Sequence, residues 1–291
     1  MVTPSLDQPL SLRQTQFLLQ SIGRSPRKNL GQNFLVDKNI VFKFLELAHP
    51  LSGENVIEIG PGLGTLTRTL LGKNCRVFAI EQDATLYAFL QQTFVDVPNF
   101  HLIQGNALSQ PLGGFDRQNE SFKIIANLPY NISTPWLEAV LKQSQLPLSM
   151  TLMLQKETVT RLLSGPGSEN FSAISIFLAS AYRPGTIFPV ARTCIWPMPR
   201  VDSVILHLER LPIPKIFHRE TKLLIRNLFT QRRKQSGSLF KIFLSQYHTH
   251  AMELLQKYNF PHSVRPGQLP LIFWQDLDQF IALSAAKNKI D

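Results

Sequence analysis

Cysteine is scarce in this chain. Only two occur in 291 residues, Cys75 and Cys194, and each lies in an apolar stretch without another cysteine or a histidine at metal-ligand spacing. This excludes a scaffold of several disulfides and a cysteine-bound zinc site, and no metal is expected. We predict that both residues are buried free thiols, and a disulfide between them is the weaker alternative.

Long apolar runs are also missing. No stretch approaches the roughly 20 apolar residues of a membrane helix, and the opening MVTPSLDQPLSLRQTQ lacks the basic start and apolar core of a secretory signal. Repeats and low-complexity tracts are absent as well. We therefore expect a soluble, cytoplasmic protein. Its 44% hydrophobic and 10% aromatic residues suffice for a full core, and its length predicts one large and one smaller domain.

Acidic residues are few compared with basic ones, and the imbalance is uneven. The chain holds 30 Lys and Arg against 20 Asp and Glu, a net charge of +10. Residues 211–291 hold 12 against 5, a net of +7, which leaves +3 for residues 1–210. An anionic partner is expected near the C-terminal end, and nucleic acid fits through phosphate neutralisation. A basic surface that only aids solubility explains the charge equally well.

Apolar runs of strand length alternate with amphipathic stretches of helical period. Asp37 is placed to cap a helix that ends near Ala48. The alternation that follows predicts an α/β fold with a parallel, doubly wound sheet covered on both faces. Two late strands are predicted to close this sheet as an antiparallel edge pair. The expected strands are NVIEIG, CRVFAIE, FHLIQG, KIIANLPY, LSMTLMLQ and the late IFPV and VDSVILHL, with helices over 84–95 and 134–142.

The segment RLPIPK at 210–215 carries two prolines and precedes a change to basic, helical sequence. We place a domain boundary there. The expected division is an N-terminal extension over 1–23, a large domain over 24–210 and a helical, basic domain over 211–291. Helices in the last domain are predicted from an apolar stripe of Leu223, Leu224, Leu228 and Phe229, and around 239–258 and 273–285.

A glycine-rich turn follows the predicted strand NVIEIG. Glu58, Gly60, Gly62 and Gly64 lie in VIEIGPGLGTLT, where an α/β sheet binds ligands beyond its carboxyl edge. A dinucleotide fingerprint requires glycine at position 65, where this chain has Thr65. An acidic residue ahead of the first glycine, without that later glycine, is similar to the loop that binds S-adenosylmethionine. A purely structural tight turn is the competing interpretation.

Two polar residues follow the next two predicted strands. Glu81 ends CRVFAIE, where a carboxylate can accept both hydroxyl hydrogens of a ribose. An ordinary exposed acid at a strand end is the alternative. Asn106 lies where an adenine ring is expected to rest, and its amide can accept from the adenine amino group and donate to a ring nitrogen. A turn residue is the alternative for Asn106.

The segment Asn127-Leu128-Pro129-Tyr130 directly follows the strand KIIA. The amino nitrogen of adenine is a poor nucleophile, because its lone pair is delocalised into the ring. The Asn127 side-chain oxygen and the Leu128 carbonyl are placed to accept its two hydrogens, so that the lone pair points at a sulfonium methyl group. Tyr130 can stack on the adenine face, and such a base must be unpaired or turned out of its stack. A common structural turn is the alternative.

Several segments together resemble the small-subunit ribosomal RNA adenine dimethyltransferase family, to which the macrolide-resistance ribosomal methyltransferases are related. The similarity runs from about residue 24 to 291, and QNFLVD and NLPYNIST in this order are its most specific parts. The matching segments are RKNLGQNFLVD, EIGPGLGTLT, AIEQD, NLPYNIST, MLQKE, PMPRVDS and TQRRK.

The resemblance implies a Rossmann-like class I S-adenosylmethionine methyltransferase sheet with a small helical C-terminal domain. It also implies transfer of four methyl groups to the N6 atoms of two adjacent adenines, in a hairpin loop near the 3′ end of small-subunit ribosomal RNA. The partner would be this RNA or the small ribosomal subunit particle, and we expect a monomer. Methyl transfer carries over to Asn127, Leu128 and Tyr130, and cofactor contacts carry over to Asn33, Leu35, Gly60, Glu81, Asn106 and Asn127, beside Glu58 and Gly62 of the glycine turn.

The residues expected to hold RNA lie in three of these segments. Arg232, Arg233 and Lys234, next to the apolar stripe, are predicted to bind phosphates. Arg200 in PMPRVDS and Lys28 in RKNLG are further candidates. A charge run that only solvates a helix is the alternative.

The chain departs from the family pattern at three places. Asn106 stands where an Asp is usual, which keeps an acceptor but removes a charge. Ile195 replaces the usual Phe ahead of the Pro-x-Pro segment, and Trp196 beside it is a substitute aromatic. Phe171-Ser172 replaces a Tyr-Gly pair, which is expected to alter the flexibility of that loop.

Three other functions fit parts of the pattern. A DNA adenine methyltransferase uses a similar motif, but Leu128 in place of its first proline and the lack of a large target-recognition domain argue against it. A macrolide-resistance enzyme acting on the large subunit stays open, although TQRRK and PMPRVDS favour the small-subunit family. A non-catalytic RNA-binding assembly or transcription factor is a third possibility, against which the intact set of predicted catalytic residues argues.

Overall fold

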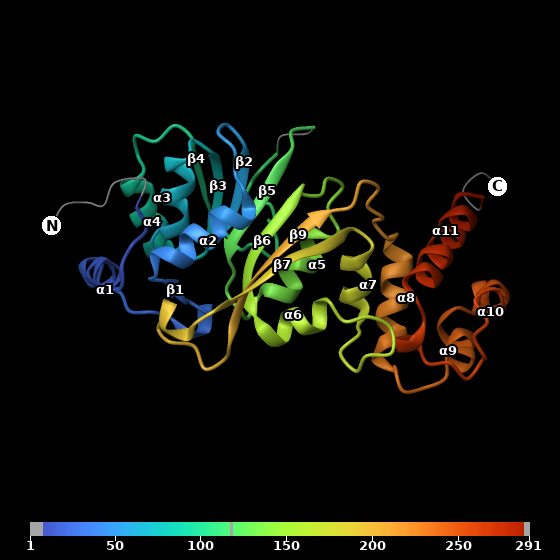
Figure 1. The fold of residues 1–291 in the computed structure, drawn as a ribbon. Coiled ribbons are helices and arrows are strands. Elements are labelled where there is room, and N and C mark those ends of the chain that lie inside the picture. The colour runs from blue at the N-terminus through green and yellow to red at the C-terminus, as the bar shows by residue number, and fades with distance from the viewer. Residues whose placement is uncertain (1–7, 117–118, 288–291) are drawn as a thin grey trace. The chain divides into compact units, whose positions relative to one another are not determined.

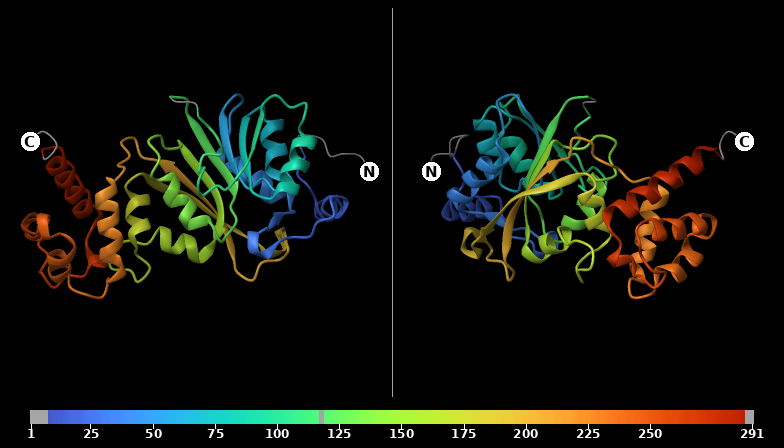
Figure 2. Two further views of the ribbon diagram at one scale, coloured as in Figure 1. Left: turned by 180° about the vertical axis from the view of Figure 1, so that it is seen from behind. Right: turned by 45° about the vertical axis from the view of Figure 1, so that its right-hand side comes forward.

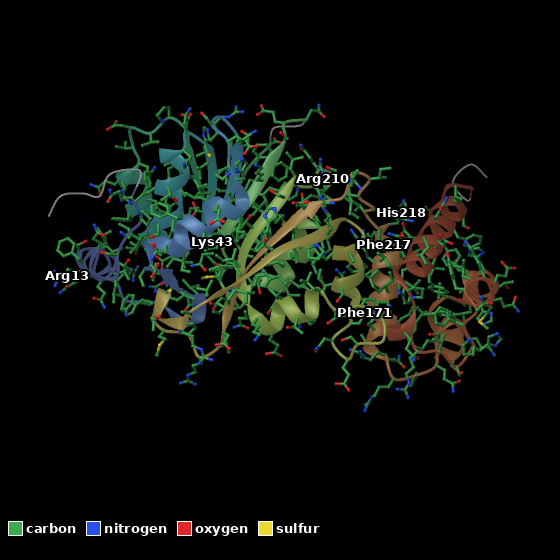
Figure 3. All side chains as sticks on the ribbon, viewed as in Figure 1. Arg13, Lys43, Phe171, Arg210, Phe217 and His218 are labelled. Carbon is green, nitrogen blue, oxygen red and sulfur yellow. The ribbon has the colours of Figure 1, made fainter. Side chains whose placement is uncertain are left out.

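The computed structural model describes residues 8–116 and 119–287, and they divide into two compact units (Figure 1). The first unit comprises Met1–Val159 and Arg183–Arg210, and the second comprises Thr160–Tyr182 and Leu211–Asp291. Residues 160–182 were expected in the large domain and belong to the second unit instead. The reason is packing, because α7 (Ala173–Ala179) contributes Phe177, whose ring lies 5.6 Å from that of Phe217 (Figure 3).

The described part of the first unit contains a sheet of seven strands in the order β4-β3-β2-β5-β6-β9-β7. The pairs β2/β3, β3/β4, β2/β5 and β5/β6 are parallel, and β9 runs antiparallel to β6. The sheet is thus parallel where the sequence predicted, with two late strands at one edge. The strands are β2 (Asn55–Ile59), β3 (Arg76–Glu81), β4 (Phe100–Gln104), β5 (Phe122–Asn127), β6 (Ser149–Gln155), β7 (Tyr182–Val190) and β9 (Ser203–Arg210).

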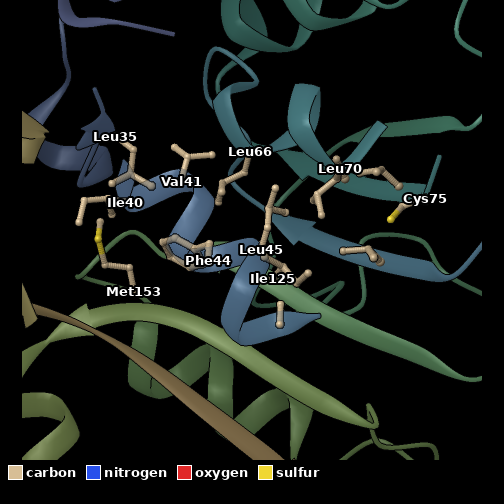
Figure 4. Close-up of a cluster of buried hydrophobic side chains, with 14 of the residues drawn as sticks. Leu35, Ile40, Val41, Phe44, Leu45, Leu66, Leu70, Cys75, Ile125 and Met153 are labelled. Atoms are coloured by element: carbon tan, nitrogen blue, oxygen red, sulfur yellow. The ribbon is translucent and has the colours of Figure 1, made fainter. Parts of the chain in front are cut away.

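Helices cover both faces of this sheet (Figures 1 and 2). On one face lie α2 (Lys38–Ala48), α3 (Thr65–Gly72) and α4 (Ala84–Thr93), and on the other lies α5 (Ser133–Val140). Asp37 and Asp83 cap α2 and α4, because each carboxylate accepts two backbone N–H groups of the first turn. Between the sheet and α2, α3 and α4 lies a cluster of buried apolar side chains (Figure 4), which includes Phe44, Leu45, Leu66, Leu70, Ile125 and Met153.

The N-terminal residues from Gln8 onward are part of the first unit and not a separate extension. Helix α1 (Leu12–Ser21) begins with a capping box between Ser11 and Gln14. Leu10 and Leu19 are buried in a cluster that also contains residues from the glycine turn and α4, whereas Arg13 is exposed (Figure 3). Residues 1–7 lie outside the described residues. The segment after α1 holds the 3-10 turn η1 (Lys28–Leu30) and strand β1 (Phe34–Leu35), which pairs antiparallel with β8 (Ile195–Trp196), a strand preceded by η2 (Arg192–Cys194).

The described part of the second unit is helical. The apolar stripe of α8 (Arg219–Thr230) differs from the prediction by one position, because Leu223 is 50% exposed and Ile225 is buried in its place. Thr221, Ile225 and Leu228 are spaced four and three residues apart, so they share the buried face of the helix. The remaining bounds are α6 (Lys156–Leu162), α9 (Ser236–Phe243), η3 (Ser245–Tyr247), α10 (His248–Lys257), η4 (Pro266–Gln268) and α11 (Leu271–Lys287).

Candidate functional site

A cavity opens at the carboxyl ends of β2, β3 and β5, in the first unit. Parallel α/β sheets bind ligands at this edge, because the strand-to-helix loops converge there. Its walls come from four segments: residues 30–35, the glycine turn, the ends of β3 and β4, and residues 127–132 except Tyr130. Eight of the predicted site residues therefore meet in one cavity: Asn33, Leu35, Glu58, Gly60, Gly62, Glu81, Asn127 and Leu128.

The glycine turn leaves room at the cavity wall. Gly60 and Gly62 have positive φ values of 65° and 62°, a conformation that residues with side chains rarely adopt. A Cβ atom on Gly62 would lie 3.1 Å from Cε1 of Phe34, which also lines the cavity. A larger residue at Gly62 would therefore strain the turn and push into the wall, as expected for a loop that a ligand approaches closely.

Glu81 ends β3 and is buried, with 6% of its surface exposed. One carboxylate oxygen accepts the N–H of Gly62 at 3.1 Å, and the other accepts the N–H of Asp83 at 2.9 Å. Burial raises the pKa of Glu81, while these two hydrogen bonds lower it. Each oxygen can accept a second hydrogen bond, so the group retains capacity for two ligand hydroxyls. The alternative of an exposed acid at a strand end does not hold.

Glu58 lies next to the last residue of β2 and is 2% exposed. The hydroxyl of Thr67, on α3, donates to its Oε2 at 2.6 Å. The pKa of Glu58 is raised to about 8, mainly by burial and also by the charge of Glu81, against the lowering effect of the Thr67 hydrogen bonds. The folded protein therefore holds a proton on Glu58 that the unfolded chain loses near its ordinary pKa of 4.5.

The difference between the folded and unfolded pKa of Glu58 makes stability depend on pH in a direction that can be tested. Between pH 4.5 and about 8 the folded state binds more protons than the unfolded state, so the free energy of unfolding contributed by Glu58 falls as the pH rises. A Glu58→Gln variant lacks this term. In urea denaturation from pH 5 to pH 8, the stability of the wild type relative to the variant should decrease steadily, and parallel curves would contradict a buried, neutral Glu58.

Asn127 ends β5, and its amide is held by the N-terminal segment. Its Nδ2 donates to the backbone oxygen of Asn33 at 2.7 Å. This contact fixes the orientation of the amide, so that Nδ2 points at Asn33. Among the described residues, none donates a hydrogen bond to Oδ1. An acceptor oriented in this way at a cavity wall can receive one hydrogen of an amino group.

Tyr130 is half-buried and does not line the cavity itself. Its hydroxyl lies 2.6 Å from Oγ of Ser203, the first residue of β9. Burial raises the pKa of Tyr130, which keeps the phenol neutral, and the Ser203 hydrogen bond lowers it. The contact fixes the ring beside residues 127–129 and connects this segment to the start of β9.

The segment containing Asn33 and Leu35 closes one side of the cavity. Leu35 is buried and pairs with Ile195 between β1 and β8, and the side chain of Asn131 donates to the backbone oxygen of Asn29 at 3.3 Å. Together with the Asn127 contact, these interactions hold residues 29–35 against the sheet edge. The structure thus gives this segment a place at the cavity that its sequence pattern alone does not indicate.

Asn106 differs from the other predicted cofactor residues. It is exposed, and its Oδ1 accepts the N–H of Leu108 at 2.9 Å. Its neighbours Gly105 and Ala107 line the cavity, while Asn106 does not. This hydrogen bond is that of a turn residue, which was the alternative interpretation, so an adenine contact from Asn106 requires a second hydrogen bond at the same oxygen or one from Nδ2.

With this geometry in view, comparison with known proteins identifies the family. A family model described as ribosomal RNA adenine dimethylase matches residues 23–263. The chain belongs to this family. Ribosomal RNA small subunit methyltransferase A of Opitutus terrae is 45% identical over 272 residues, covering 92% of this chain and 98% of that protein. The protein of the same name from Pseudomonas putida is 37% identical over 248 residues, covering 84% and 91%.

Solved structures confirm the fold of the family. A dimethyladenosine transferase from Plasmodium falciparum has a TM-score of 0.70 with 23% identity, covering 84% of this chain and 95% of that chain. The 23S rRNA methyltransferase ErmE has a TM-score of 0.62 with 21% identity, covering 84% and 98%. The predicted family, enzyme class and α/β class I methyltransferase fold are therefore confirmed.

The predicted RNA contacts of the family member lie on both units. Arg232 differs from its neighbours, because its guanidinium donates to the backbone oxygens of Glu169 at 2.6 Å and Ser168 at 3.2 Å. It thereby holds the loop that follows α6, while Arg233 and Lys234 are exposed. Arg200 is also exposed, and the side chain of Lys28 lies outside the described residues.

Two departures from the family pattern have packing consequences. Ile195 is 2% exposed in the core, and Trp196 lies on the opposite face of β8, where its ring is 6.5 Å from that of Phe34. Trp196 therefore supports the cavity wall through Phe34 without lining the cavity. Phe171 is buried and packs edge-on against Phe229 at 5.8 Å, which anchors its loop within the second unit (Figure 3).

A set of polar contacts beside the cavity, between residues 24–32 and the start of α4, was not predicted from the sequence. Asp83 is 4% exposed. Its carboxylate forms an ion pair with Arg27 at 3.2 Å and accepts a hydrogen bond from Nε2 of Gln32 at 3.5 Å. Arg24 donates to the hydroxyl of Thr85, two residues after Asp83. Asp83 could have been found from its position as a helix cap, but nothing in the sequence indicates its partners, because they lie over 50 residues earlier.

Within residues 8–116 and 119–287, no group of three His, Cys, Asp or Glu side chains could hold a metal ion. None of the helices in the same ranges is long and apolar enough to cross a membrane.

Proposed function

We propose that this chain uses S-adenosylmethionine to dimethylate the N6 atoms of two adjacent adenosines in a hairpin near the 3′ end of small-subunit ribosomal RNA. One observation carries the chemistry: the Asn127 amide is fixed by Asn33, with its acceptor oxygen available at the cavity. The target is supported by relatives at 36–45% identity that bear the name small subunit methyltransferase A. The enzyme acts in the cytoplasm as a monomer.

The cavity fits the cofactor on chemical grounds. The carboxylate of Glu81 is an acceptor for a ribose diol, and Gly62 leaves space that a Cβ would remove. Asn33, Leu35 and Gly60 would hold the remainder. When bound, S-adenosylmethionine supplies an electrophilic methyl group on a sulfonium centre.

The chain's own residues then act on the adenine. Oδ1 of Asn127 and the carbonyl of Leu128 accept the two N6 hydrogens, which localises the nitrogen lone pair in the direction of the methyl group. Tyr130, held by Ser203, stacks on the ring and limits its rotation. No charged base is required, because the N6 proton becomes acidic only after the methyl group has arrived. Its release to water permits a second transfer to the same nitrogen.

RNA is held by exposed cations, of which Arg233, Lys234 and Arg200 are the described candidates. Arg232 is assigned to the loop at 168–169 instead. The double variant Arg233→Ala/Lys234→Ala should bind small subunits more weakly, with a slope of log affinity against log salt that is shallower by up to about 1.8, or about 0.9 for each lost phosphate contact. Filter binding between low and moderate salt measures this slope.

The matched control is Lys73→Ala/Lys142→Ala. Both lysines are exposed and follow helices α3 and α5, whose C-terminal ends lie at the sheet edge opposite the cavity. Their removal changes the net charge equally and should leave the slope as in the wild type. Equal slopes for all three proteins would mean that Arg233 and Lys234 only solvate the second unit.

A large-subunit target is the second candidate. The fold of ErmE resembles this chain, but at 21% identity that likeness concerns the fold alone. A role in particle assembly can accompany catalysis, since the cavity and its polar residues are complete. Mass spectrometry of nucleosides from purified small-subunit and large-subunit RNA, with and without the gene, distinguishes these cases. Loss of N6,N6-dimethyladenosine from small-subunit RNA alone is expected, and loss from large-subunit RNA alone would refute the proposed target.

A further inference from the structure

The cavity has an unusual charge composition. Among its described lining residues, Glu58 and Glu81 are the charged ones, and none is Lys, Arg or His. Both carboxylates are buried, so water screens them weakly. The cavity therefore favours a ligand with net positive charge over an isosteric neutral one.

The two acids are held differently. Burial raises the pKa of Glu81 as well, but both of its oxygens accept backbone N–H groups, which lowers the pKa and stabilises the ionised form. Glu58 has hydrogen bonds only from Thr67 among the interactions that shift its pKa, and burial dominates, so that its pKa is raised to about 8. Glu58 is therefore the acid whose proton is more easily exchanged near neutral pH.

Other charges near Glu58 are committed elsewhere. The charged neighbour of Glu58 on β3 is Glu81, and the cation of α3, Arg68, has its guanidinium over the Phe94 ring at 5.2 Å. Asp83, at the start of α4, is paired with Arg27. On β5 the cation is Lys123, at the opposite end of the strand, where it pairs with Glu54 at 2.8 Å. None of the described cations on these elements lines the cavity, so a positively charged ligand would meet no cation there.

From this arrangement we infer, on the basis of the proposed function, that Glu58 distinguishes the sulfonium cofactor from the thioether product by charge. Glu58 loses its proton to the solvent when the sulfonium ligand enters, and the carboxylate then faces a positive centre. After methyl transfer the sulfur is neutral, and the carboxylate recovers a proton from the solvent. Glu58 thereby favours entry of the cofactor and release of the product.

Proton release on binding tests this directly. Calorimetric titration of the full-length protein with S-adenosylmethionine at pH 7, in phosphate and in Tris buffer, gives the number of protons exchanged. Glu58 should release about 0.9 proton per cofactor, because a group of pKa about 8 is about nine-tenths protonated at pH 7. Glu58→Gln should release fewer protons by that amount, and the difference excludes protons from the ligand itself.

The control is Glu54→Gln, a change of the same type just before β2, at the opposite end of the strand from Glu58. It should release as many protons as the wild type. In Glu58→Gln the affinity ratio of S-adenosylmethionine to S-adenosylhomocysteine should fall by about tenfold, the effect of one weakly screened charge pair. Equal proton release in Glu58→Gln and the wild type would overturn the inference.

A measurement on the wild type alone does not depend on the variant folding. Between pH 6 and pH 8 the affinity for S-adenosylmethionine should rise almost tenfold per pH unit, whereas the affinity for the thioether should change much less. Parallel profiles for the two ligands would overturn the inference and leave the proposed function intact. A protein that binds neither ligand would instead overturn the proposed function.

Discussion

Asn127→Ala should lower the turnover number for methyl transfer by about 100- to 1,000-fold, the usual effect of removing one oriented group that stabilises a transition state. The lost acceptor acts on the adenine amino group as its lone pair localises, so the effect belongs to catalysis and not to cofactor affinity. Single-turnover assays with radiolabelled S-adenosylmethionine and small ribosomal subunits measure this directly.

The variant also leaves the backbone oxygen of Asn33 without its hydrogen bond at 2.7 Å, so a control for folding is needed. Asn99→Ala removes an amide that donates to Asn74 at the opposite edge of the sheet, and it should retain full turnover. Asn127→Ala should bind S-adenosylmethionine within a few-fold of the wild type and melt as a folded protein. Unchanged turnover in a folded Asn127→Ala would refute the proposed role of the residue.

Glu81→Ala should weaken S-adenosylmethionine binding by about 1.5 to 3 kcal/mol, the usual contribution of a hydrogen bond to a charged group, or about 10- to 150-fold in the dissociation constant. The carboxylate is the acceptor expected for the ribose hydroxyls. Calorimetric titration gives the affinity, and thermal unfolding without ligand shows how much the fold itself loses.

This second readout is needed because Glu81 also accepts the backbone N–H groups of Gly62 and Asp83. Glu209→Ala is a matched control, since Glu209 lies near the end of strand β9 and its ion pair with Arg183 is exposed. It should leave cofactor affinity unchanged. If Glu81→Ala binds S-adenosylmethionine as tightly as the wild type, the carboxylate does not contact the ribose.

Much of the fold follows from local patterns. The strand at 55–59 is buried throughout and was visible as an apolar run, and Asp37 and Asp83 cap their helices as short polar residues ahead of apolar stretches do. Non-local packing was less accessible. Residues 160–182 group with the second unit because Phe177 contacts Phe217, 40 residues later, and no periodicity within either segment indicates such a contact.

In the site, too, local patterns predicted some residues, whereas long-range contacts were not predictable from them. Gly60, Glu81 and Asn127 follow strand ends, and the topology of a parallel sheet brings such positions together at one edge. Asn33 reaches the cavity through a hydrogen bond to a residue 94 positions away, which only the resemblance to the family suggested. For Arg232, charge alone predicted a phosphate contact, whereas the structure shows that it binds two backbone oxygens.

The central claim concerns the position that is methylated, so the most direct test maps it. Small subunits from cells that lack the gene can be incubated with the purified protein and S-adenosylmethionine, and the RNA can then be cut into defined fragments and weighed by mass spectrometry. The account predicts a mass gain of four methyl groups in one fragment near the 3′ end, on two adjacent adenosines, and no gain with Asn127→Ala. Methylation confined to another fragment, to large-subunit RNA, or to no RNA at all would contradict it.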